Sequence, residues 1–166
     1  GQAAVVDSLS TFKERWDMFT QGQLRFVDFS NVVVAGGSVL ACLLDLPEQL
    51  TSTSSGPIPP VQRYYQEGPF SNSDIDLFLF ECDTEQVCMS FILPQGRMKI
   101  RELYRAIKRA NPHADCVVRT RSALTIYTQF PYRKIQIILR VFASPVDVLH
   151  QFDLDCVCVL FNGREV

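Results

Sequence analysis

The sequence lacks a long apolar run and an excess of charge of either sign. Of its 166 residues, 16 are Lys or Arg and 18 are Asp or Glu, which gives a formal net charge of -2. This balance gives no support for a general nucleic-acid or membrane surface, so a polyanion would have to bind through local basic residues. No apolar run approaches the roughly 20 residues that span a bilayer, and the N-terminus lacks a signal-peptide pattern. We therefore expect no membrane association.

The chain also lacks a CxxC pair, and its two histidines lie far apart. A zinc site is therefore not expected. Six cysteines lie mostly within apolar runs, where free cysteine packs as a small hydrophobic residue. We expect an intracellular protein, cytoplasmic or nuclear, that keeps these thiols reduced. The length fits one domain over residues 1–166, and the abrupt end at residues 163–166 suggests a piece of a longer protein.

Hydrophobic periodicity predicts a mixture of helices and strands. Helices are expected at residues 8–20, 38–46, 84–93, 96–112 and 144–152, and strands at 31–37, 74–81, 116–120, 122–128, 134–142 and 155–161. Residues 47–73 carry five prolines and many serines and threonines, which predicts a long surface loop. The order of elements predicts an α/β (α+β) fold, with a mixed β-sheet flanked by helices.

A glycine turn interrupts the apolar run at residues 32–44, where Gly36, Gly37 and Ser38 separate the expected strand from the expected helix. Glycine lets the backbone approach a ligand closely. A serine hydroxyl at the start of a helix adds a donor to the free N–H groups there, and together these groups can bind an anion. The turn is therefore a candidate phosphate site.

A pair of carboxylates, Asp74 and Asp76, stands at the head of the apolar strand that follows the long loop. Residues two apart on a strand point to the same face, so the two side chains are expected to project together. Two such charges repel each other unless a cation lies between them, and Mg²⁺ or Mn²⁺ prefers these oxygen ligands. The alternative is that Asp74 caps a turn and Asp76 is solvated.

The stretches "VVVAGGSVLACLL" and "SDIDLFLF" together resemble the nucleotidyltransferase fold of the polymerase-beta-like superfamily. The chain is similar to nucleotidyltransferase-like domains of protist, fungal and large-virus proteins, some of which also carry ankyrin repeats. The resemblance implies that Gly37 and Ser38, with Gly36, contact a nucleoside triphosphate, and that Asp74 and Asp76 bind two magnesium ions. It implies an enzyme that transfers a nucleoside monophosphate to a hydroxyl group of a protein, an RNA or a small molecule.

Two features depart from that family's pattern. Ser38 and Asp74 lie 36 positions apart, although a surface insertion of this length costs little loop-closure entropy. The family usually places a third carboxylate on a later strand, where this chain has Gln136, which has no charge and binds magnesium weakly. Asp153 or Asp155 could supply the missing acid, or both could be solvated loop residues.

Basic residues near the ends of the expected strands offer a further contact for phosphate. Arg133 is the residue of this group that we predict to bind the nucleotide, although such residues can also form an ordinary solvated sheet edge. Because Gln136 stands at the third acid position, the alternative function is a catalytically inactive module of the same fold. Such a module would serve protein interaction or nucleotide sensing.

Overall fold

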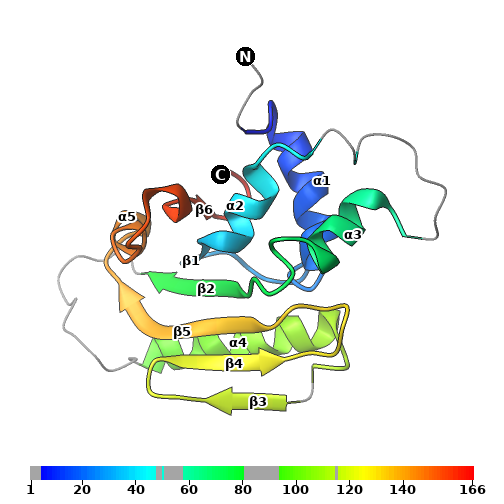
Figure 1. Ribbon diagram of the computed structural model, residues 1–166. Coiled ribbons are helices and arrows are strands. Elements are labelled where there is room, and N and C mark those ends of the chain that lie inside the picture. Colours follow the sequence, from blue (N-terminus) through cyan, green and yellow to red (C-terminus); the bar gives the residue numbers. More distant parts are fainter. Residues whose placement is uncertain (1–4, 48–49, 51–57, 81–93, 115) are drawn as a thin grey trace.

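The computed structural model describes residues 5–47, 50, 58–80, 94–114 and 116–166 (Figure 1). Six strands form one sheet in the order β3-β4-β5-β2-β1-β6. The strands are β1 (Val32–Ala35), β2 (Ile75–Phe80), β3 (Cys116–Arg119), β4 (Ala123–Tyr127), β5 (Ile135–Phe142) and β6 (Leu160–Phe161). Among these six described strands, β2 and β5 pair in parallel, and the other neighbours are antiparallel. The predicted mixed sheet flanked by helices is confirmed.

The helices divide unequally between the two faces of this sheet. They are α1 (Leu9–Thr20), α2 (Gly37–Leu43), α3 (Pro60–Glu67), α4 (Pro94–Ala110) and α5 (Pro145–Leu149), with a 3-10 turn η2 at Asp155–Val157. The first four helices contribute to the larger hydrophobic core, and α5 packs into a smaller one through Val148. None of the helices in the described part of the chain is long and apolar enough to cross a membrane.

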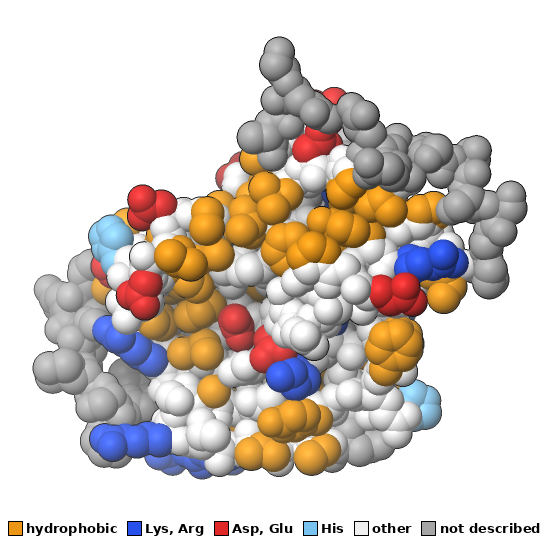
Figure 2. All heavy atoms as spheres, viewed as in Figure 1, with side chains coloured by type: hydrophobic (Ala, Val, Ile, Leu, Met, Phe, Trp, Pro, Cys, Tyr) orange, Lys and Arg blue, Asp and Glu red, His pale blue; other side chains and the backbone are white. Residues whose placement is uncertain are grey.

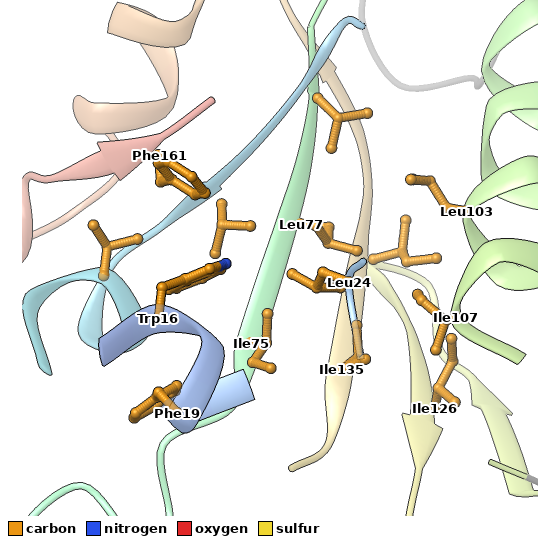
Figure 3. Close-up of a cluster of buried hydrophobic side chains, with 14 of the residues drawn as sticks. Trp16, Phe19, Leu24, Ile75, Leu77, Leu103, Ile107, Ile126, Ile135 and Phe161 are labelled. Carbon is orange, nitrogen blue, oxygen red and sulfur yellow. The ribbon is translucent and has the colours of Figure 1, made fainter. Parts of the chain in front are cut away.

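The alternation of side chains along β2 determines what each face carries. Ile75, Leu77 and Leu79 point into the larger core, and Figure 3 shows Ile75 and Leu77 between aromatic rings from α1 and aliphatic side chains from α4. Phe78 points the other way, into the smaller core. Because strand side chains alternate, Asp76 shares the face of Phe78 rather than that of the larger core. The face with the smaller core is therefore where the carboxylates lie.

Two predictions about local structure were wrong. Residues 60–67, placed in the predicted long loop, form α3, which is anchored in the larger core by the buried ring of Tyr65. The predicted strand at 155–161 is instead the 3-10 turn η2 followed by the two-residue strand β6. Proline is well suited to the first position of a helix, so Pro60 can begin α3 in spite of the proline-rich composition that indicated a loop. In both segments tertiary packing outweighs the local sequence signal. The helix predicted at 84–93 lies outside the described residues.

Candidate functional site

The structure brings the glycine turn and the two carboxylates together at one edge of the sheet. In the antiparallel pair of β1 and β2, Val34 lies opposite Leu77, so continuing the register by one residue places Ala35 opposite Asp76. The chain then turns at Gly37, where a Cβ atom would lie 3.7 Å from the hydroxyl oxygen of Ser73. Residues separated by 36 positions in the sequence are therefore neighbours in the fold. Ser73 was not predicted, although it directly precedes Asp74.

Gly36 makes this arrangement possible through its backbone conformation. Its φ of 91° and ψ of -147° are open to glycine but strained for other residues. A Cβ atom at this position would also lie 2.9 Å from the ring of Phe152. The N–H of Gly36 donates to the carbonyl of Val159, which ties the turn to the segment before β6. Gly36 therefore has a structural role that needs no ligand.

The hydroxyl of Ser38 is buried, and no described residue forms a hydrogen bond with it. The residue is 1% exposed, and its oxygen has no hydrogen bond among the described residues. An unpaired buried hydroxyl costs about 1–3 kcal/mol, so one in a folded protein calls for an explanation. Ser38 stands one residue inside α2, where the first N–H groups have no partner within the helix. A phosphate oxygen would satisfy these donors once a local movement exposes the buried hydroxyl.

Asp74 and Asp76 differ in how their charges are compensated. Lys134 Nζ lies 3.2 Å from Oδ1 of Asp74, and Gln136 Nε2 donates to Oδ2 of Asp74 at 2.6 Å. Asp76 lies opposite Gln136 in the parallel pair of β2 and β5. Figure 2 shows acidic side chains beside a basic one over the start of β2 and β5. Lys134 belongs to the basic group that the sequence placed near strand ends, but its contact with Asp74 was not predicted.

The pKa of Asp76 reflects a charge that nothing fully balances. The pKa of this carboxyl is raised from 3.8 to about 6, chiefly by burial and in addition by the neighbouring charge of Asp74, while the charge of Lys134 acts in the opposite direction. A group with this pKa binds a proton more readily than an ordinary aspartate. A divalent cation between the two carboxylates would replace that proton and remove the repulsion.

The donors at this edge fit one divalent cation better than two. The described part of the chain contains no group of three or more His, Cys, Asp or Glu side chains that could hold a metal ion. Asp74 and Asp76 supply carboxylate oxygens, and Gln136 adds an amide beside them. Hard oxygen donors of this kind suit Mg²⁺ or Mn²⁺. The two-ion arrangement implied by the resemblance would need a third acid that Gln136 replaces.

The structure does not add Asp153 or Asp155 to the carboxylate pair. Both side chains are exposed, with Asp155 at the start of η2. Neither carboxylate forms a hydrogen bond or ion pair with Asp74 or Asp76 in the described residues, and no three-acid cluster forms there. Their spacing in the sequence predicted a shared face only for an extended segment. The segment is not extended, because the 3-10 turn η2 begins at Asp155.

Arg133 is buried, and its donors are used within the protein. The residue is 7% exposed, and its guanidinium group lies 3.7 Å from the centre of the Phe19 ring. It donates to the backbone carbonyls of Phe19, Tyr65, Phe70, Ser71 and Ser73. Burial lowers its pKa to about 10. The side chain therefore fixes the segment that leads into Asp74, and these contacts leave it little capacity for the phosphate contact predicted from the sequence.

Comparison with known proteins corrects the family inferred from the sequence. A sequence profile described as "Gad2: Gabija anti-defense 2 family protein" matches residues 10–166. No curated protein and no solved structure matches the chain. The resemblance to the polymerase-beta-like nucleotidyltransferase superfamily is thus wrong as an assignment of family, since the matching profile is of another family. Short motifs such as Gly-Gly-Ser and Asp-x-Asp contain too few residues to identify a family.

Proposed function

The chain belongs to the Gad2 (Gabija anti-defense 2) family, and on this premise we propose that it counteracts a Gabija-type defense as a divalent-cation-dependent nucleotidyltransferase. The observation that carries the proposal is the convergence of the Gly37–Ser38 turn with Asp74 and Asp76 on one edge of the sheet. A nucleoside triphosphate with its cation needs both a set of phosphate donors and a carboxylate pair. The proposal concerns the reaction and does not depend on membership in a nucleotidyltransferase superfamily.

Each residue of the site has a part in binding. Asp74 and Asp76 would hold Mg²⁺ or Mn²⁺, which neutralises charge on the triphosphate when it is bound. The hydroxyl of Ser38 and the N–H groups at the start of α2 would donate to phosphate oxygens. Lys134 is half-exposed and pairs with Asp74, so its ammonium group becomes available to a phosphate once that carboxylate binds a cation.

The reaction would transfer a nucleoside monophosphate to a hydroxyl group of a protein, an RNA or a small molecule. The acceptor oxygen bonds to the α-phosphorus, the bond from that phosphorus to the β-phosphate oxygen breaks, and pyrophosphate leaves. The hydroxyl proton passes to water. The residues of the turn and of β2 contribute by holding the triphosphate in position and by offsetting its charge, which are the main sources of rate in phosphoryl transfer.

Gln136 favours a second candidate, in which the same site binds a nucleotide without transferring it. Its amide donates to Asp74 at 2.6 Å, at the position where a third carboxylate was expected. An uncharged amide cannot accept the proton of an attacking hydroxyl. In this form the protein would act against the defense by binding a nucleotide or by contacting another protein.

Both candidates are tested with the wild-type protein. Each of the four nucleoside triphosphates, given with Mg²⁺, is expected to raise the melting temperature by an amount that increases with the logarithm of its concentration relative to its Kd, since it binds only the folded state. Incubation with an α-labelled triphosphate and an extract of cells that carry the defense then separates the candidates. Label on an acceptor supports transfer, and a melting shift without label supports binding alone. If the protein shows neither a melting shift nor transferred label, both roles that depend on a bound nucleotide are contradicted.

Replacement of Ser38 by alanine is expected to weaken nucleotide binding without harming the fold. The hydroxyl has no partner in the described protein, so its removal costs no hydrogen bond and relieves an unpaired buried group. Loss of one hydrogen bond to a charged phosphate should raise the Kd for the Mg²⁺–triphosphate complex by about 10-fold or more. Calorimetric titration measures the Kd, and thermal unfolding measures stability. An unchanged Kd would remove Ser38 from the phosphate site.

A further inference from the structure

Helix α4 carries a row of four arginines on its outer face. Arg97, Arg101, Arg105 and Arg109 follow one another at intervals of four residues, and all four side chains are exposed. A rise of 1.5 Å per residue spaces them by about 6 Å and makes the row about 18 Å long. The opposite face of α4 packs into the larger core through Ile100, Leu103 and Ile107, so the arginine row points to solvent. We call these four residues the arginine row.

Nothing in the described protein balances the charge of the arginine row. The helix has one acidic residue, Glu102, and its carboxylate pairs with Lys99 at 3.9 Å rather than with an arginine. None of the four arginines forms an ion pair with any other described residue. Like charges four residues apart on a helix repel each other and destabilise it. A row of this kind in a chain with a net charge of -2 is therefore not a by-product of a basic composition.

A further arginine, Arg25, extends the arginine row at its C-terminal end. The guanidinium groups of Arg25 and Arg109 lie 4.9 and 4.1 Å from the centre of the same ring, that of Phe26. Phe26 is itself 39% exposed. Arg25 also donates to the carbonyl of Ala110 at 3.4 Å. Two guanidinium groups are thus held next to one aromatic ring at the surface, an arrangement that an anion between them would stabilise.

We propose that the arginine row, with Arg25, binds the phosphate backbone of double-stranded DNA. Guanidinium groups bind phosphates in bidentate geometry, and a duplex presents one negative charge for about every 1.7 Å of its axis. An α-helix about 10–12 Å across fits the major groove of B-DNA, which is about 12 Å wide. The deep and narrow major groove of A-form RNA does not admit a helix. Placement of the cations along one rigid helix therefore suits duplex DNA better than RNA.

This surface is separate from the carboxylate site. Figure 1 shows α4 behind β4 and β5, and its core residues share the face of the sheet that carries Ile75 and Leu77. Asp74 and Asp76 project from the opposite face, where the smaller core lies. DNA on the arginine row would therefore leave the carboxylates open to a nucleotide. The inference does not rest on the proposed transfer reaction, and either can fail alone.

Fluorescence anisotropy with a labelled duplex of about 20 base pairs and arbitrary sequence tests the proposal. The wild-type protein should bind with a Kd on the order of micromolar at about 50 mM salt and weaken steeply by about 200 mM. Five phosphate contacts, four from the arginine row and one from Arg25, predict a slope of log K against log salt of about -4.5. The double variant Arg101→Gln/Arg105→Gln should raise the Kd at least about tenfold and reduce the slope to about -2.7, since two contacts are lost.

The matched control is Arg63→Gln/Arg164→Gln, which removes the same two charges from exposed positions on α3 and near the C-terminus. It should keep the slope of the wild type. Neither double variant should melt below the wild-type temperature, because each replacement lies on the surface. The variant of the arginine row can gain stability, since it removes repulsion between like charges four residues apart. The proposal is overturned if the duplex does not bind at about 50 mM salt, as expected of a row that contacts an acidic protein instead, or if the two double variants weaken binding equally.

Discussion

Replacement of Asp76 by asparagine is expected to lower the rate of label transfer by about 10³-fold or more. The variant keeps the size and shape of the side chain but loses the negative charge that would hold the divalent cation. Asp74 alone cannot compensate, because the proposed cation site needs both carboxylates. Label incorporated from an α-labelled triphosphate measures the rate. A variant that transfers label at the wild-type rate would contradict the proposed site.

The same variant should be more stable than the wild type when divalent cations are chelated. The pKa of Asp76 is about 6 in the folded protein against 3.8 for an ordinary aspartate, so the folded state favours the protonated carboxyl. That contribution to stability is fully present below the unfolded pKa and is lost as the pH rises through about 6. With allowance for solvent screening, asparagine should add about 1–2 kcal/mol at alkaline pH and nothing in acid.

The stability of the Asp76 variant is read from urea unfolding at several pH values, and Asp17→Asn serves as the control. Asp17 is exposed on α1, so its replacement removes one charge without touching the site. It should change neither the transfer rate nor the pH dependence of unfolding. A variant of Asp76 that unfolds more easily than the wild type at alkaline pH would show that the carboxylate serves the fold rather than a ligand.

Replacement of Arg133 by methionine is expected to lower the free energy of unfolding by about 3–5 kcal/mol. Methionine fills part of the volume but offers no donor. The carbonyls of Phe19, Phe70 and Ser73, which accept from the guanidinium group, would lose that partner in a buried position. The contact with the Phe19 ring would lose its charge as well. Urea unfolding followed by circular dichroism measures the change.

The control for this prediction is Arg63→Met, an exposed arginine on α3, which should change stability by less than about 0.5 kcal/mol. The variant Arg133→Lys separates charge from geometry, because one ammonium group cannot reach the same set of carbonyls as a planar guanidinium. It should recover only a small part of the loss. Full recovery by lysine would mean that the charge alone, and not the fork of donors, holds the segment before Asp74.

The sequence predicted those features that depend on neighbours along the chain. Apolar periodicity located α1, α4 and most strands, because the period of a buried face is a local property. The sequence also indicated the glycine turn, because glycine is favoured where the backbone takes a positive φ. Gly36 has a φ of 91° in the structure. The short motifs were less informative, and they led to the wrong family because a few residues occur in many unrelated proteins.

Tertiary structure decided which of the candidate residues meet. The sequence alone placed Asp74 and Asp76 on one face of a strand, but only the pairing of β1 with β2 put them beside Gly37. The sequence also suggested Asp153 and Arg133 as ligands. In the folded protein Asp153 is exposed on the surface, and Arg133 donates to backbone carbonyls. Strand register and burial arise from contacts between residues far apart in the chain, and no local pattern encodes those contacts.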